Sequence, residues 1–180
     1  MPDDRTLPAG ELGRSDEHRA RGAGRTGLQF LTMLANGELA PPPILQTLGM
    51  ELASIEPGRA VFTFEPQEHH YNPIGSVHGG VYTTLLDSAA GCAVHSMLPA
   101  NVGYTSIDLT VMFLGAIRVG PGTVTCTGTL DHLGRRTALA RADLIDANGR
   151  KLATAISSCL ILGPLTAADA GIDQPTLDQT

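Results

Sequence analysis

The chain has 180 residues, a length typical of one domain and sufficient to bury a hydrophobic core. Hydrophobic residues make up 42% and charged residues 17%, and the formal net charge is −6. This acidic balance argues against a nucleic-acid-binding protein, which needs a basic surface to neutralise phosphates. No apolar run approaches the roughly 18 residues of a membrane span, so we expect no membrane association.

The cysteines, Cys92, Cys126 and Cys159, lie far apart and are odd in number, which suits a reducing compartment. The first residues contain no apolar segment of the kind found in secretory signals, so we expect a cytoplasmic protein. His69 and His70 are adjacent, but no Cys, Asp or Glu completes a ligand set at usable spacing. We therefore predict neither a metal site nor a cofactor.

Three regions are expected along the chain. Residues 1–25 are charged and have little to bury, which indicates a flexible tail. Residues 26–164 are predicted to form the domain, and residues 165–180 a second flexible tail. At the start of the domain, apolar residues at helical spacing predict a helix over 28–35 that ends at Asn36-Gly37.

The next segment is predicted to be extended. Three prolines at 41–43 stop a helix and lead into a strand. Residues 50–55 and 60–64 then read as two strands joined by the turn Glu56-Pro57-Gly58.

The longest predicted helix runs from His78 to Met97. Apolar residues recur at a spacing of three to four, and few charges interrupt them, so this helix is expected to be buried on most sides. Pro99 ends it.

The remainder of the chain alternates between apolar and polar residues, as strands do. These strands are predicted within residues 107–113, 123–130, 138–145 and 152–162. The short turns between them favour antiparallel pairing. The sequence therefore predicts an α+β domain, in which an antiparallel sheet of five to six strands wraps around one long central helix.

The start of that helix carries the sequence His78-Gly79-Gly80, here called the glycine turn. A helix N-terminus offers unpaired N–H groups and a partial positive charge, and glycine lets another molecule approach the backbone. The same features stabilise the oxyanion formed when a carbonyl is attacked. A tight entry from loop to helix would also explain the two glycines.

Asp87 is the only acidic residue of the long helix and lies two turns beyond the glycine turn. A carboxylate on a mostly buried helix is costly unless it is paired or used, although it could simply reach solvent. Gly91, one turn further, leaves open space beside it. Asn72 could form a turn, or it could donate its amide N–H to a substrate carbonyl.

Together these residues resemble the PaaI-type (phenylacetate-pathway) thioesterases of the hotdog superfamily. The resemblance covers about residues 28–162, and its core is NPIGSVHGGVYTTLLDSAAG at 72–91, where the spacing from Asn through HGG to Asp agrees with the family pattern. The resemblance implies a hotdog fold. It also implies an acyl-CoA thioesterase that releases a carboxylate and free CoA without a metal or redox cofactor.

The resemblance also implies residue roles. The Gly79 N–H would bind the thioester carbonyl oxygen, aided by Asn72. Asp87 would activate water as a general base or attack as the nucleophile. His78 would orient the loop rather than transfer protons. A hydroxyl residue on the strand after the helix would position the attacking water, either Ser106 or Thr105.

Gly80, Arg135 and Arg136 are the expected CoA-binding residues. The family often carries basic residues where Gly134-Arg135-Arg136 opens a strand, and guanidinium groups suit phosphate oxygens. Two arginines after a turn are also common on solvated surfaces.

The resemblance further implies an active site assembled across a homodimer, with Asp87 of one subunit facing Asn72 and Gly79 of the other, and often a homotetramer. Pairing of two sheets edge to edge would bury exposed strand edges. A non-catalytic acyl-CoA-binding hotdog protein is the alternative, since fold does not fix function. A hotdog dehydratase would need a different His/Asp pair. Phenylacetyl, other aryl and medium-chain acyl groups all remain open as substrates.

Overall fold

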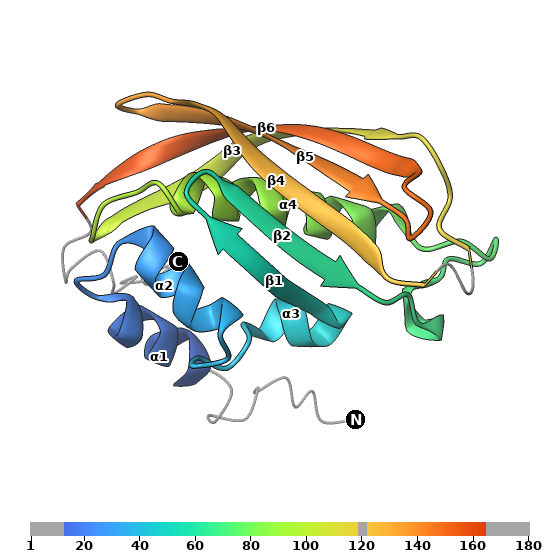
Figure 1. The fold of residues 1–180 in the computed structure, drawn as a ribbon, viewed down its shortest axis with the longest axis horizontal. Coiled ribbons are helices and arrows are strands. Elements are labelled where there is room, and N and C mark those ends of the chain that lie inside the picture. Colours follow the sequence, from blue (N-terminus) through green and yellow to red (C-terminus); the bar gives the residue numbers. More distant parts are fainter. Residues whose placement is uncertain (1–12, 119–121, 165–180) are drawn as a thin grey trace, which may run out of the picture.

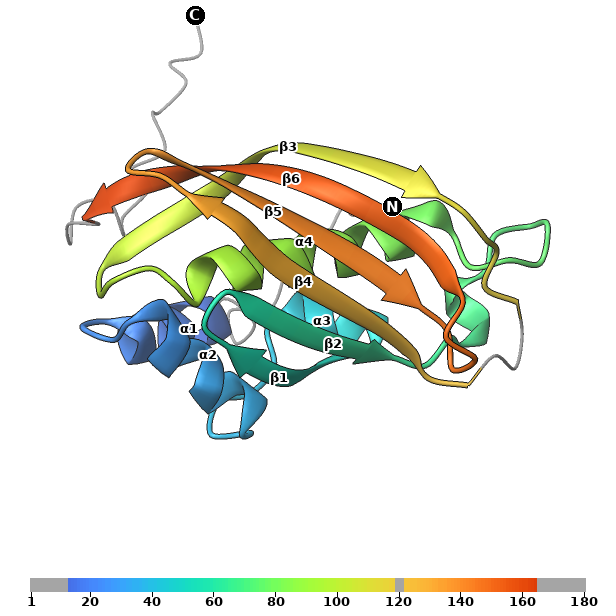
Figure 2. The same ribbon diagram turned by 45° about the horizontal axis from the view of Figure 1, so that its top comes forward.

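The computed structural model describes residues 13–118 and 122–164. Six strands form one antiparallel sheet in the order β1-β2-β4-β5-β6-β3, which curves around the long helix α4 (Figures 1 and 2). The α+β architecture predicted from the sequence is thus confirmed. The elements are α1 (Gly13–Gly22), α2 (Gly27–Ala35), α3 (Pro43–Leu48), β1 (Met50–Glu56), β2 (Arg59–Phe64), a 3₁₀ turn (Glu68–His70), α4 (Gly79–His95), β3 (Val102–Phe113), β4 (Val124–Leu133), β5 (Thr137–Ile145) and β6 (Lys151–Pro164).

Helix α4 is the centre of the core. Its buried side chains occupy most of its circumference, as its nearly charge-free sequence predicts. It begins one residue later than predicted, because His78 serves as its N-cap, and it ends two residues earlier at His95.

The sheet approaches α4 most closely at Gly128 of β4. A Cβ atom at this position would lie 2.0 Å from the backbone carbonyl oxygen of Ala89, so no residue with a side chain fits there. Two residues earlier in β4, the Cys126 thiol donates to the Leu85 carbonyl at 3.4 Å. Small residues therefore allow strand backbone to pack directly against helix backbone.

Strand β3 forms one edge of the sheet and contains a β-bulge. Ser106 pairs with Cys159 and Asp108 with Ser158, so Ile107 is an extra residue in β3. A bulge reverses which side chains face the core. Before it, Ser106 points to α4; after it, Phe113 does.

Two segments differ from the expectations. Gly13–Gly22 forms helix α1 within the stretch expected to be a flexible tail, and the ring of His18 lies 6.4 Å from that of Phe30 in α2. Helix α3 begins at Pro43, the last of the three prolines, where we expected extended chain. Proline fits the first turn of a helix because the N–H that it lacks would have no partner there.

Helix α2 agrees with its predicted range to within one residue, and Thr26 caps it. Residues 1–12 and 165–180 lie outside the described part of the chain, so the tails remain predictions there. Within the described ranges, none of the helices combines the length and apolar character needed to cross a membrane.

Candidate active site

Asp87 lies near the middle of α4 with its side chain half-buried. Its Oδ1 atom accepts a hydrogen bond from the Ser106 hydroxyl at 3.0 Å. The neighbouring Thr105 hydroxyl instead donates to the backbone carbonyl of Ser106, at 3.5 Å. Of the two hydroxyl residues considered from the sequence, the structure brings Ser106 to the carboxylate.

The space beside Asp87 is partly filled by Tyr104. A Cβ atom on Gly91 would lie 2.5 Å from the Tyr104 hydroxyl oxygen, so the open space expected at Gly91 holds an aromatic ring instead. Burial holds the pKa of Tyr104 well above its ordinary value, and the charges of Cys92, Cys159 and Asp87 raise it further. Tyr104 is therefore a neutral phenol at physiological pH.

Cys92 is not suited to nucleophilic chemistry. Burial raises the pKa of its thiol to about 12, with a smaller contribution from the charge of Asp87. Since the thiolate is the reactive form, the thiol is inert near neutral pH.

The glycine turn presents one backbone N–H to a ligand. The His78 side chain accepts the Gly80 N–H at Nδ1 over 2.9 Å, and the His78 carbonyl accepts the Val81 N–H at 2.9 Å. Within the described ranges the Gly79 N–H has no acceptor. Gly80 therefore differs from its expected role, because its amide is already engaged with His78.

The Asn72 side chain stabilises its own loop through local hydrogen bonds. Its Oδ1 atom accepts the N–H groups of Ile74 at 3.1 Å and Ser76 at 3.3 Å, and its Nδ2 donates to the Ser76 hydroxyl at 3.1 Å. This is the turn-forming role considered from the sequence. It uses one of the two N–H groups of the amide.

A second loop supports the glycine turn from the end of β3. The Ile117 carbonyl accepts the Val77 N–H at 3.1 Å. The Tyr82 hydroxyl accepts the Ile117 N–H and donates to the Gly115 carbonyl at 3.2 Å. Burial raises the pKa of Tyr82, which keeps this phenol protonated. No pattern in the sequence points to this role, because it depends on a contact between distant segments.

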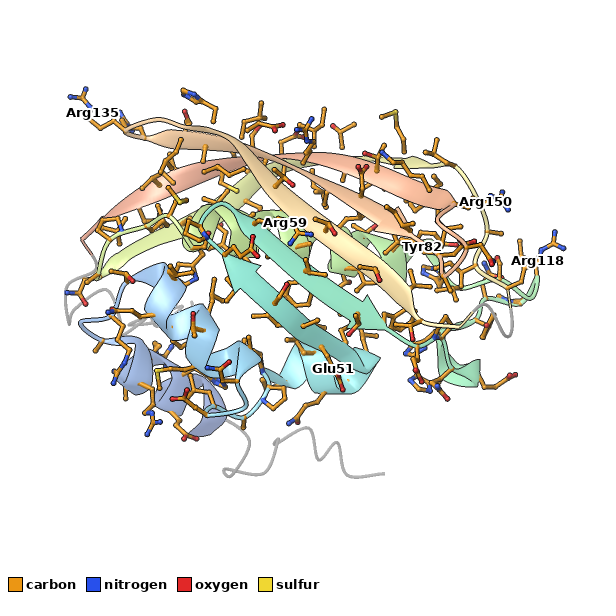
Figure 3. All side chains as sticks on the ribbon, in the orientation of Figure 1. Glu51, Arg59, Tyr82, Arg118, Arg135 and Arg150 are labelled. Carbon is orange, nitrogen blue, oxygen red and sulfur yellow. The ribbon has the colours of Figure 1, made fainter. Side chains whose placement is uncertain are left out.

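Arg135 and Arg136 lie on the exposed β4–β5 turn. The turn is closed by the Gly134 N–H, which donates to the Thr137 carbonyl at 2.8 Å. Both arginines border a hollow of about 560 Å³ that also touches Leu98. Arg135 projects from one end of the sheet, whereas Tyr82, next to the glycine turn, lies toward the other (Figure 3).

Asp87 and Gly79 lie far apart on α4. They are separated by eight residues, which corresponds to about 12 Å along the helix axis. An attacking water and an oxyanion donor each lie about 3 Å from the reacting group. The separation along the helix is therefore longer than either of these contacts.

Comparison with known proteins gives a consistent result. The thioesterase superfamily model matches residues 74–153. A 1,4-dihydroxy-2-naphthoyl-CoA hydrolase from Listeria monocytogenes is 31% identical over 117 residues, which cover 64% of this chain and 91% of that protein.

Two solved structures share the fold. The Escherichia coli PaaI protein from the phenylacetic acid degradation operon has a TM-score of 0.66 at 23% identity, covering 73% of this chain and 93% of that one. A Streptococcus mutans protein bound to acetyl-CoA has a TM-score of 0.59 at 23% identity, covering 64% and 90%. The hotdog fold expected from the sequence is thereby confirmed.

Proposed function

The chain belongs to the thioesterase superfamily, and on that premise we propose that it hydrolyses an acyl-CoA thioester to a carboxylate and free CoA. The observation that carries the proposal is the hydrogen bond from Ser106 on β3 to Asp87 on α4, the helix that also carries the unoccupied Gly79 N–H. These groups supply a base, a hydroxyl that orients water, and an oxyanion donor. The proposed reaction uses neither a metal ion nor a redox cofactor.

In the proposed reaction the thioester carbonyl accepts a hydrogen bond from Gly79 at the N-terminus of α4. Asp87 removes a proton from a water held by Ser106, and the water oxygen bonds to the carbonyl carbon. The tetrahedral intermediate then breaks its C–S bond, and CoA leaves as the thiol with the proton from Asp87.

In the second route considered, Asp87 is the nucleophile rather than the base. Its carboxylate attacks the carbonyl carbon, CoA leaves, and water hydrolyses the resulting anhydride. A single turnover in ¹⁸O-water separates the routes, because only attack by Asp87 can leave label in the protein's carboxyl group.

A homodimer would complete the site. The separation of about 12 Å between Asp87 and Gly79 supports a site in which the two groups acting on one thioester come from different chains. Strand β3 is the available edge for pairing two sheets, and Ile107 and Phe113 on it are 59% and 57% exposed. Edge pairing would satisfy its unpaired backbone groups.

The same two-fold arrangement supports Arg135 and Arg136 as phosphate ligands. If Asp87 of one chain faces the Gly79 of the other, the two α4 helices run antiparallel. The C-terminal end of the first helix then extends past the glycine turn of the second by about 12 Å. The β4–β5 turn lies at that end, where Arg136 accepts the Ile161 N–H through its carbonyl at 2.9 Å. A CoA nucleotide bound there would meet both guanidinium groups.

A CoA ester is the proposed substrate class. The Listeria relative is a CoA-ester hydrolase, and the Streptococcus mutans structure contains acetyl-CoA. A non-catalytic binding protein is the alternative, but a pure binder has no reason to hold a carboxylate beside the thioester. The pairing of Asp87 with Ser106 therefore favours the enzyme.

The test is thiol release from a panel of aryl and medium-chain acyl-CoA esters, with wild type and Asp87→Asn at matched concentration. We expect turnover of at least one ester, lowered in the variant by about two orders of magnitude or more. Asp108→Asn is the matched control, because Asp108 is an exposed acid on β3, the strand that carries Ser106. A folded protein that binds CoA esters and hydrolyses none would refute the proposal in favour of a binding protein.

A further inference from the structure

A buried histidine lies behind the glycine turn. His70 is 2% exposed, and its ring packs on Phe64 with 4.8 Å between the ring centroids. Its Nδ1 atom accepts the backbone N–H of Gln67 at 2.8 Å, so the ring is neutral and carries its proton on Nε2. Nε2 is buried and has no hydrogen-bond partner within 3.5 Å among the described residues, and the Leu48 carbonyl is the backbone group that interacts with the ring.

The backbone of His70 fixes the glycine turn. Its carbonyl accepts the His78 N–H at 2.8 Å, and the next residues, Tyr71 and Val77, pair as an isolated β-bridge. These contacts close the loop from 70 to 78 at its base. His78 in turn holds the Gly80 N–H through its side chain, so the position of His70 determines where the turn lies.

We propose that neutral His70 is a positioning residue for the glycine turn, and that its protonation loosens this turn. The inference rests on the proposed function, in which the Gly79 N–H of that turn binds the thioester oxygen. His70 does not touch the substrate. It acts through the backbone of His78.

The chemical reason lies in the Nδ1 atom. Protonation converts Nδ1 from an acceptor into a donor, so the hydrogen bond from Gln67 is lost and the 3₁₀ turn that carries His70 loses its anchor. The new charge is buried next to His69, whose ring centroid lies 3.9 Å away. Both effects oppose the arrangement that holds the loop closed.

The groups around His70 keep it neutral over most of the physiological range. Burial lowers the pKa of His70, the charge of His69 lowers it further, and the Leu48 carbonyl opposes them. Strand β2 presents the uncharged Phe64, and the neighbouring Glu68 is exposed. A lowered pKa means that the folded state prefers the neutral ring. This contribution to stability is present above the ordinary value of 6.5 and is lost as the pH falls toward the lowered pKa.

The test is amide hydrogen exchange of the segment from 70 to 82, at about pH 7.5 and about pH 5.5, corrected for intrinsic rates. In wild type we expect exchange of this segment to rise by about tenfold at the lower pH. His70→Leu removes the acceptor and should exchange quickly at both values. His70→Asn keeps an acceptor that does not titrate, so its exchange should depend little on pH. His69→Asn removes only the neighbouring charge and keeps the acceptor at Nδ1 of His70, so the rise in exchange at the lower pH should persist in this variant.

The same variants separate positioning from general stability in thiol-release assays. His70→Leu should lower kcat by about tenfold or more with little change in KM, because the oxyanion donor is displaced. His70→Asn should retain most of kcat near neutral pH. If His70→Leu fails to fold, the pH dependence of hydrogen exchange in His70→Asn decides whether the inference holds.

The inference would be overturned if exchange of the segment from 70 to 82 rose at low pH in His70→Asn as much as in wild type. Equal protection of the turn in His70→Leu and wild type would do the same, even if hydrolysis is normal. Hydrogen exchange is measured without turnover. A protein that hydrolyses no ester would therefore refute the proposed function, while the exchange data would still test the role of His70.

Discussion

At the scale of single residues, the candidate site depends on a hydroxyl that reaches a carboxylate across two elements. Ser106 on β3 donates to Asp87 on α4, while Thr105 beside it turns to a backbone carbonyl. Successive side chains of a strand point to opposite faces, so only one of the two can face the helix.

Ser106→Ala should therefore lower kcat by roughly tenfold to a hundredfold, the range expected for loss of a hydrogen bond to a charged group. Thr105→Ala on the same strand is the matched control and should stay within about twofold of wild type. Steady-state kinetics on the best ester of the panel measures both. Equal losses in the two variants would contradict the assignment of Ser106 to the water-positioning role.

Sequence spacing pointed to Asp87 and the glycine turn because both belong to one short motif. Tyr104 and His70 were not predicted as part of the site. Tyr104 reaches the site by packing against Gly91, and His70 by a backbone hydrogen bond to His78. Contacts of this kind join separate segments and leave no periodic signal in the sequence. Thr105 and Ser106 could not be separated, because the bulge that follows them is not encoded by spacing.

At the scale of elements, strand β4 packs its backbone directly against that of α4. The hydrogen atom of Gly128 occupies a position where any Cβ would overlap the Ala89 carbonyl. The strand cannot move away without breaking its pairing with β2 and β5 on either side.

Gly128→Ala should lower the free energy of unfolding by about 3 kcal/mol, at the upper end of the cost of overpacking a core. Gly163→Ala in β6 is the control, because nothing lies within 4 Å of the added atom; it should change stability by no more than about 0.5 kcal/mol. Urea unfolding monitored by circular dichroism gives both values. A Gly128→Ala protein as stable as wild type would show that α4 can shift along the sheet.

The long elements were predictable and the short ones were not. Helix α4 and the strands have enough residues to show a period, and α4 agrees with its predicted range to within two residues. Helix α3 has only six residues and begins at the last of three prolines, so sequence alone favoured extended chain. Helix α1 has a polar sequence, and its contacts to α2 decide whether it is ordered.

At the scale of the whole molecule, the sheet has one exposed edge next to the candidate site. Strand β3 carries both Ser106 and the apolar side chains of Met112 and Phe113, which are 52% and 57% exposed. An uncovered apolar edge is rare in monomers because it promotes association. The proposed dimer would cover this edge and complete the site in one step.

Ile107→Lys should weaken this association, because lysine on an edge strand opposes pairing with another strand. We expect dimers and activity to be lost together as protein concentration falls, since each proposed site is built from two chains. Ile44→Lys on α3 is the control, with a side chain of similar exposure, 50% against 59% for Ile107. Light scattering coupled to gel filtration measures the mass. A fully active monomer would refute a shared site.

The β-bulge at Ile107 divides β3 into two parts that contact different regions of α4. Up to Ser106 the even-numbered residues face α4, and beyond the bulge the odd-numbered residues do, ending at Phe113 against Gly79. A deletion or insertion in one half of β3 would exchange the inward-facing and outward-facing side chains of that half. The bulge would confine the exchange to that half. The strand can therefore accept changes in the part that packs near the glycine turn without altering how Ser106 meets Asp87.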